Sequence, residues 1–266
     1  MSDPPSIAAR AEQARPVRVL AIAGSDSSGG AGIQADIKTI TMLGGYAMSA
    51  ITAVTAQNTR GASRVEPLDP ALVAAQIDAC LEDIGVEAVK IGLIGNADIA
   101  EVVADRVEAM ACPIVFDPVL VATSGAILAD PATIEVFGWL MELATLTTPN
   151  VPELAALGGH EGMAARAGGR GVCYLAKGGD AEGPLVEDRL VRPGVADVIW
   201  REARILTRHT HGSGCTLSSA IATRLAGGAS LEEAIIAGRG FVRAAMLAAP
   251  GFGAGHGPMG HQAVRY

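Results

Sequence analysis

The sequence predicts an α/β fold in which helices cover both faces of a mostly parallel β-sheet. Short strand segments that are apolar throughout alternate with amphipathic helical segments. Strands of this kind are typical of parallel sheets that are buried on both faces. Hydrophobic residues make up 50% of the chain and charged residues 18%, which excludes an intrinsically disordered protein. A chain of 266 residues is also long enough to bury a full core without disulfides or metals.

The predicted strands are short apolar runs, and a polar or glycine-containing loop follows each of them. They cover residues 17–23, 47–55, 86–91, 114–117, 146–148 and 172–176. The segment 185–192 differs, because two short strands there flank Asp188 and Arg189. We therefore expect a small β-hairpin that turns at these two residues.

The predicted helices follow from apolar residues at helical spacing and from capping residues. They cover residues 31–44, 70–84, 96–111, about 215–227 and a segment after 230. Asp69 and Pro70 suit the N-cap and the first position of the second helix. Ser230 and Glu233 have the spacing of a capping box at the start of the last helix.

The composition and the domain organisation narrow the classes of partner. No repeat or long linker divides the chain, so we expect a loosely attached tail over 1–16 and one domain over 17–266. The formal net charge of −8 argues against nucleic-acid and anionic-membrane surfaces. No apolar run is long enough to span a membrane, and the first residues do not resemble a signal peptide. Four cysteines without a CxxC motif suit the reducing cytoplasm.

Polar segments follow several predicted strands at their carboxyl ends, where open parallel sheets bind their ligands. These segments are 24–32, 57–59, 117–118, 148–153 and 177–180. Any one of them is consistent with an ordinary polar loop. Their shared position at one edge of the sheet predicts a binding site there. The first segment lacks the Gly-Lys-Ser/Thr ending of a P-loop and the register of a dinucleotide fingerprint.

The segment from His209 to Thr216 points most directly to chemistry. Gly212 and Gly214 permit a tight turn, and the N–H groups at the start of the next helix can then bind phosphate or a developing oxyanion. The same position predicts a lowered pKa for the Cys215 thiol. A buried structural cysteine is the alternative interpretation. Lys177, at a strand end before two glycines, suits either a phosphate contact or solvent, and the histidine spacings do not predict a metal site.

Several of these motifs together resemble the hydroxymethylpyrimidine/phosphomethylpyrimidine kinases of thiamine biosynthesis, within the ribokinase superfamily. The resemblance runs from about residue 17 to the end of the chain, and its motifs occur in the family's order. They are residues 23–36, 55–59, 90–92, 117–119, 148–153, 177–179 and 209–216. This resemblance implies a ribokinase-like three-layer αβα sandwich, phosphate transfer from ATP with Mg²⁺, and a homodimer.

The resemblance also implies a role for individual residues. Cys215 is implied as the general base, and the N–H groups of Gly212, Ser213 and Gly214 are implied to stabilise the transferring phosphoryl group. Lys177, Asn150 and Thr210 are implied to contact the nucleotide, while Glu153 and Asn150 are implied to hold Mg²⁺ through water. The residues implied to bind the pyrimidine substrate are Asp36, Gln57, Gly24, Ala31, Leu93 and Leu120.

The sequence departs from the family pattern in two places, and three alternative functions stay open. The stretch between Asn150 and Lys177 is short and rich in glycine, which puts a helix there in doubt, and the loop 179–183 is abbreviated. A pyridoxal kinase of vitamin B6 salvage is the main alternative, because its substrate is also a flat heteroaromatic ring with a hydroxymethyl arm. A cysteine-nucleophile enzyme using Cys215 and His211, and a non-catalytic pyrimidine-binding protein, are the others. Whether residues 25–30 close over the substrate is left open.

Overall fold

A computed structural model describes residues 15–120 and 130–265 of the chain. The predicted tail over 1–16 therefore lies largely outside the described residues. The described strands are β1 (Arg18–Asp26), β2 (Tyr46–Asn58), β3 (Gly61–Pro67), β4 (Ala88–Ile91), β5 (Ile114–Phe116), β6 (Leu146–Thr147), β7 (Tyr174–Ala176), β8 (Leu185–Arg192) and β9 (Val195–Ala203). They form one sheet in the order β3-β2-β1-β4-β5-β6-β7-β8-β9. The strands from β2 to β7 in this order run parallel, whereas β3, β8 and β9 pair antiparallel with their neighbours.

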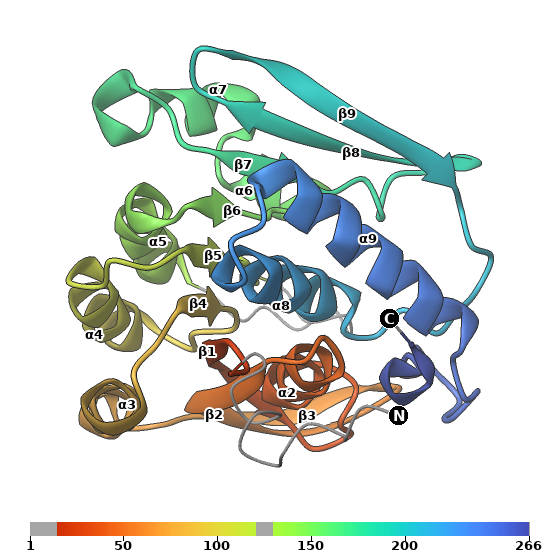
Figure 1. Ribbon diagram of the computed structural model, residues 1–266, viewed down its shortest axis with the longest axis horizontal. Coiled ribbons are helices and arrows are strands. Elements are labelled where there is room, and N and C mark those ends of the chain that lie inside the picture. Colours follow the sequence, from red (N-terminus) through yellow and green to blue (C-terminus); the bar gives the residue numbers. More distant parts are fainter. Residues whose placement is uncertain (1–14, 121–129, 266) are drawn as a thin grey trace, which may run out of the picture.

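Helices cover both faces of this sheet, which confirms the predicted three-layer architecture (Figure 1). The helices are α2 (Gly32–Met42), α3 (Pro70–Ala79), α4 (Ala97–Glu108), α5 (Pro131–Leu143), α6 (Val151–Ala156), α7 (Gly159–Ala165), α8 (Ser213–Ala226) and α9 (Leu231–Leu247). One layer contains α3, α4 and α5, and the other contains α2, α8 and α9. None of the helices in the described ranges is long and apolar enough to cross a bilayer.

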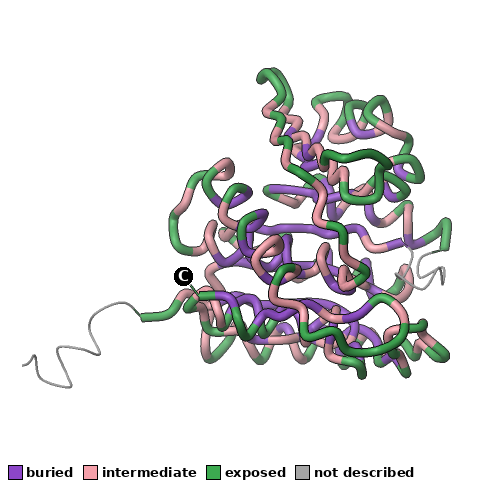
Figure 2. The backbone as a smooth tube through the Cα atoms, turned by 90° about the vertical axis from the view of Figure 1, so that its right-hand side faces the viewer, coloured by how far each residue is buried: buried purple, intermediate pink, exposed green. Residues whose placement is uncertain are grey.

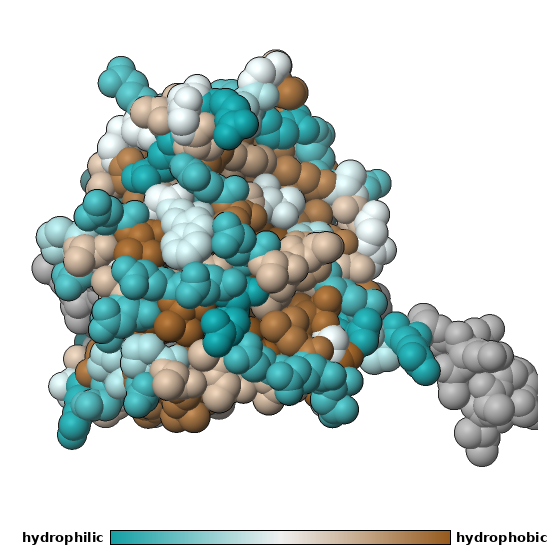
Figure 3. Space-filling model, turned by 90° about the vertical axis from the view of Figure 1, so that its left-hand side faces the viewer, coloured by the Kyte–Doolittle hydropathy of each residue, from teal (hydrophilic) through white to brown (hydrophobic). Residues whose placement is uncertain are grey.

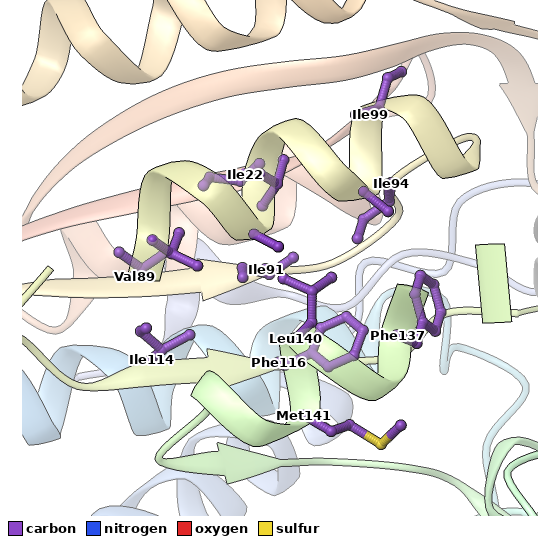
Figure 4. Close-up of a cluster of buried hydrophobic side chains, with 14 of the residues drawn as sticks. Ile22, Val89, Ile91, Ile94, Ile99, Ile114, Phe116, Phe137, Leu140 and Met141 are labelled. Atoms are coloured by element: carbon purple, nitrogen blue, oxygen red, sulfur yellow. The ribbon is translucent and has the colours of Figure 1, made fainter. Parts of the chain in front are cut away.

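The alternation of side chains along β1 builds a hydrophobic core on each face of the sheet. Leu20 and Ile22 pack into the core under α3, α4 and α5, whereas Val19 and Ala21 pack into the core under α2, α8 and α9. In the first core the Phe116 and Phe137 rings meet edge to face, with their centroids 5.0 Å apart (Figure 4). The buried backbone is accordingly concentrated in the central strands (Figure 2).

The molecular surface over α3, α4 and α5 is mixed in character. Hydrophilic and hydrophobic side chains alternate there in small areas (Figure 3). The apolar side chains of all three helices pack against the sheet, as the amphipathic sequences of α3 and α4 predict. Asp69 caps α3 as expected, accepting a hydrogen bond from the Ala71 N–H at 2.8 Å. Regular α-helix ends at Ala79, and a π-helical turn continues to Ile84.

The predicted position of the hairpin turn is wrong. Residues Leu185–Arg192 form one continuous strand, β8, which pairs with β9. The turn lies instead at Pro193 and Gly194, where Gly194 has a φ of +72°. Asp188 does not face solvent as a turn residue would, because it is buried and accepts hydrogen bonds from the Gly178 N–H and the Arg239 guanidinium.

Other elements were missing from the sequence prediction. β3 extends the sheet beyond β2, and α5 begins at Pro131 with Asp130 as its N-cap. The glycine-rich stretch after Asn150 contains two short helices, α6 and α7. The doubt about helical structure in this stretch is therefore resolved in favour of short helices.

Candidate active site

A cavity of about 780 Å³ opens at the carboxyl ends of the parallel strands. Each of the six parallel strands contributes wall residues from its carboxyl end or the following loop, and the start of α8 completes the wall. All but one of the site residues named from the sequence line this cavity. They are Gly24, Ala31, Gln57, Leu93, Leu120, Asn150, Glu153, Lys177, Thr210, Gly212, Ser213, Gly214 and Cys215.

The loop before α8 packs against the glycine-rich turn after β1. Gly212 has a φ of +82° and is the N-cap of α8. A Cβ atom at Gly212 would lie 2.0 Å from the Gly30 carbonyl oxygen, so this close approach requires glycine. The first N–H groups of a helix have no partners within the helix, and those of Gly214 and Cys215 lie in the cavity wall. The start of α8 therefore lies in the cavity wall, and such a helix terminus suits an anion.

The predicted lowering of the Cys215 pKa is wrong for this structure. Burial raises the pKa of the Cys215 thiol to about 11. Lys90 and the Gly32 N–H oppose this effect, whereas Asp36 and Asp117 reinforce it. The sequence shows the helix terminus, which favours the thiolate, but not the depth of the thiol, and here desolvation has the larger effect.

Lys177 belongs to a buried group of charges beside the start of α8. Its Nζ lies 2.6 Å from Asp117 Oδ1 and 3.9 Å from Glu153 Oε2. A Cβ atom at Gly214 would lie 3.2 Å from the same Nζ, which places the ammonium next to the start of α8. Burial disfavours the charge, but Asp117 and Glu153 together outweigh it and raise the pKa of Lys177. Lys177 is therefore a permanent cation in the cavity wall.

Asn150 and Glu153 form a capping box at the start of α6. Asn150 Oδ1 accepts a hydrogen bond from the Glu153 N–H, and Glu153 Oε2 accepts one from the Asn150 N–H, both at 2.8 Å. Burial raises the pKa of Glu153 to about 7, although Lys177 opposes the shift. Within the described ranges, no group of three or more His, Cys, Asp or Glu side chains has the arrangement of a metal site.

Asp26, His211 and Gln57 contact one another in the cavity wall. His211 Nε2 is 2.8 Å from Asp26 Oδ2 and 3.1 Å from Gln57 Nε2. Asp26 also accepts hydrogen bonds from the Gly30 and Ala31 N–H groups. Burial opposes its charge, but the bonds to His211, Ser28 and Ala31 lower the pKa of Asp26 to about 2.

Asp36 is the one named site residue that does not line the cavity. Its side chain is completely buried between α2, the sheet and α8. Lys90 Nζ lies 2.9 Å from Asp36 Oδ2, and Ser219 donates a hydrogen bond to Asp36 Oδ1 at 2.8 Å. The implied contact between Asp36 and the substrate is therefore corrected, because its carboxylate is already used inside the protein.

The sequence reasoning assigned no role to Asp26, Lys90 or Asp117, and it considered His211 only as a partner of Cys215 or a metal. All four residues lie in the motifs quoted above, and Asp26 belongs to the first glycine-rich turn. Asp117 pairs with Lys177 across 60 positions, and Asp26 pairs with His211 across 185. Nothing in a single sequence identifies such distant pairs, so only the fold reveals them.

Residues 26–260 match the protein family described as phosphomethylpyrimidine kinase. The hydroxymethylpyrimidine/phosphomethylpyrimidine kinase of Rhizobium meliloti is 44% identical over 257 residues, which cover 91% of this chain and 96% of the relative. The thiamine biosynthesis bifunctional protein ThiED of Geobacter sulfurreducens is 45% identical over 257 residues and 91% of this chain. The aligned part spans 52% of that longer protein.

A solved structure of Bacillus subtilis pyridoxal kinase, in complex with ADP, has a similar fold. Its TM-score is 0.82 at 32% sequence identity, and the match covers 94% of this chain and 98% of the kinase. The family match, the identity with the Rhizobium enzyme and the architecture of the cavity agree. The chain belongs to the phosphomethylpyrimidine kinase family.

Proposed function

We propose that this chain uses ATP and Mg²⁺ to phosphorylate 4-amino-5-hydroxymethyl-2-methylpyrimidine, and then phosphorylates the monophosphate to the diphosphate, in thiamine biosynthesis. One observation carries this proposal: Cys215, the proposed anion site at residues 212–215, Lys177 and Gln57 line the same cavity. A base, an anion site and a group that can recognise a ring are thereby within one volume. The names of the Rhizobium and Geobacter relatives support the choice of substrate.

The pyrimidine is assigned to the part of the cavity around Gln57. The Gln57 amide can pair with a polar ring edge. Thr55 donates a hydrogen bond to its oxygen at 3.3 Å, and His211 Nε2 lies 3.1 Å from its nitrogen. Leu93 and Leu120 supply apolar walls for the ring, while the backbone near Gly24 and Ala31 lies beside it. Asp36 lies behind the cavity wall, where it pairs with Lys90, and does not contact the ring.

The transfer step needs alignment and charge stabilisation more than covalent chemistry from the protein. The hydroxymethyl oxygen forms a bond to the γ-phosphorus as the bond to the ADP oxygen breaks, and the hydroxyl proton passes to the ionised Cys215 Sγ. The N–H groups of residues 212–215 and the Lys177 ammonium stabilise the charge on the phosphoryl oxygens. Asn150 and Thr210 line the same wall and are assigned to the nucleotide.

The residues around Glu153 suit a hydrated Mg²⁺ ion. Mg²⁺ retains several waters and commonly binds through one or two carboxylates together with substrate phosphates. Glu153 is a buried carboxyl with a pKa near 7, so a nearby cation would favour its ionised form. Glu153 and Asn150 would hold the ion through water, and the bound ion would neutralise phosphate charge.

Pyridoxal phosphorylation is the second candidate, and the fold similarity to the Bacillus pyridoxal kinase favours it. ADP release should be measured with Mg-ATP and, in matched assays, hydroxymethylpyrimidine, its monophosphate or pyridoxal. Turnover of both pyrimidines well above pyridoxal supports the proposal. A preference for pyridoxal, or turnover of none of the three, contradicts it.

We also propose that the enzyme works as a cytoplasmic homodimer, as its family resemblance implies. The described cysteines Cys80, Cys112, Cys173 and Cys215 are all free thiols, which suits a reducing compartment. Light scattering after size-exclusion chromatography tests the dimer by measuring whether the mass is twice the 27.0 kDa of one chain. The mass of a single chain would contradict it.

A further inference from the structure

Lys90 is a buried cation to which the proposed reaction assigns no role. It lies in β4 near the centre of the sheet, and its side chain is 0% exposed. Asp36 Oδ2 accepts a hydrogen bond from the Lys90 ammonium at 2.9 Å. Ser219 donates a hydrogen bond to the other carboxylate oxygen, Asp36 Oδ1, at 2.8 Å. Removing both charges from water has a large cost, so a buried ion pair is weak evidence for a role in stability.

Hydrogen bonds connect this ion pair to the helix that carries Cys215. Ser219 follows Cys215 by four residues in α8, so the two side chains lie on one face of the helix, a turn apart. Asp36 reaches this face from α2, and Lys90 reaches it from β4. Three elements of the fold therefore bring their polar groups together at Ser219, one helical turn after Cys215.

The Lys90 ammonium lies beside Gly92, one residue before the cavity wall. A Cβ atom at Gly92 would lie only 2.6 Å from Lys90 Nζ, so the glycine leaves space for the ammonium. The next residue, Leu93, lines the cavity itself. Lys90 is therefore shielded from solvent but adjacent to the volume in which the reaction is proposed to occur.

We propose that Lys90 is a positioning residue that stabilises the thiolate form of Cys215 through its buried positive charge. This inference rests on the proposed role of Cys215 as the general base. The charged groups that act on the thiol come from four parts of the fold. They are Lys90 from β4, Asp36 from α2, Asp117 after β5 and Lys177 after β7, and Glu153 acts on Lys177. Asp36 and Asp117 disfavour the thiolate, so the lysines must offset them.

The electrostatic effects support this assignment. Burial is the largest influence on the pKa of Cys215, and Lys90 is the largest influence that opposes burial. Burial also disfavours the charge of Lys90, but Asp36, Cys215 and Asp117 outweigh it and raise the pKa of Lys90. Lys90 consequently remains protonated while the thiol loses its proton.

The test is the rate at which iodoacetamide alkylates Cys215, followed by peptide mass spectrometry between about pH 7 and pH 10. The variants are Lys90→Met and the double variant Lys90→Met with Asp36→Asn, which leaves no unpaired buried charge. We expect slower alkylation in both, by about threefold for each unit of pKa increase. Tenfold less thiolate is partly offset by the higher nucleophilicity of a more basic thiolate.

Two controls separate an effect of charge from a change in the fold. Cys173 is partly buried in the same chain, and its alkylation rate should be unchanged in every variant that folds. Lys38→Met removes an exposed lysine from α2 and should leave the Cys215 rate unchanged. An unchanged or faster Cys215 rate in a folded Lys90 variant would overturn the inference.

Alkylation reports the ionisation of Cys215 without requiring turnover, so the two proposals can fail separately. If Cys215→Ala retains full turnover, Cys215 is not the base, whatever the alkylation rates show. If Cys215→Ala loses turnover but the Lys90 variants alkylate normally, the base assignment remains and the role of Lys90 is rejected.

Discussion

His211 Nε2 lies 2.8 Å from Asp26 Oδ2, although 185 positions separate the two residues in the sequence. Both side chains are buried, and Asp26 also holds the N–H groups of Gly30 and Ala31. This contact fastens the turn after β1 to the loop before α8. Two of the loops that border the candidate active site are thereby held together by one carboxylate.

The Asp26 contact should contribute to stability in a pH-dependent way. Its pKa of about 2 lies below the unfolded value of about 3.9, so the contribution is fully present above pH ~4 and is lost as the pH falls through about 2. The shift corresponds to about 2–3 kcal/mol. Urea unfolding of the wild type and Asp26→Asn should show a stability difference that shrinks over this interval. A constant difference from pH 6 to pH 2 would argue against the linkage.

Gln57 and Asp36 should respond differently to substitution by alanine. Gln57→Ala removes a hydrogen-bonding group from the cavity, and we expect KM for the pyrimidine to rise by about tenfold with a smaller change in kcat. Asp36→Ala leaves Lys90 as an unpaired buried charge, and we expect a loss of about 3–5 kcal/mol of stability. Steady-state kinetics and denaturant unfolding measure the two effects. A stable Asp36→Ala protein with a raised KM would restore the implied substrate contact.

Turnover should rise with pH if ionised Cys215 is the general base. Its pKa of about 11 means that little thiolate exists near neutral pH, so kcat should increase across pH 7–10. Cys215→Ala should lower kcat by about 10²–10⁴-fold, and kcat of this variant should no longer increase with pH between about pH 7 and pH 10. The pH profiles should be measured at saturating substrate and Mg-ATP. An unaltered profile in Cys215→Ala would remove the residue from the base role.

Glu153 should make the apparent affinity for Mg²⁺ dependent on pH. Its pKa of about 7 predicts a weaker apparent affinity for Mg²⁺ below pH 7, where the carboxyl is protonated, so the rate should need more Mg²⁺ there. Glu153→Gln keeps a side-chain oxygen for the capping box while removing the charge. This variant should need more Mg²⁺ at pH 8 and lose the pH dependence around 7. Equal Mg²⁺ titrations of the two proteins at pH 8 would contradict the assignment.

The sequence was sufficient for the parts of the fold that depend on local pattern. The six parallel strands and the helices beginning near Gly32, Pro70 and Ala97 follow from apolar periodicity and from caps such as Asp69. The turn at Pro193 and Gly194 was missed because Asp188 resembles a turn residue in sequence but is neutralised by Arg239 from α9. Tertiary pairing of this kind has no local signal.

The candidate site was also predicted only in part from the sequence. The sequence motifs placed thirteen named residues in one cavity, because loops after parallel strands converge on one edge of the sheet. They did not predict the pKa of Cys215 or the position of Asp36. Both depend on burial and on charges from distant strands, which act through space rather than through neighbouring sequence.

The parallel arrangement also determines where the chain can tolerate changes in length. Each of the six parallel strands supplies part of the cavity wall, so inserting one residue into a strand would move that part by about 3.3 Å. The same insertion would turn alternate side chains from one core to the other. The β8–β9 turn at Pro193 and Gly194 has no side chain in that wall. Insertions and attached probes can therefore be accommodated at this turn while the spacing of the reacting groups is preserved.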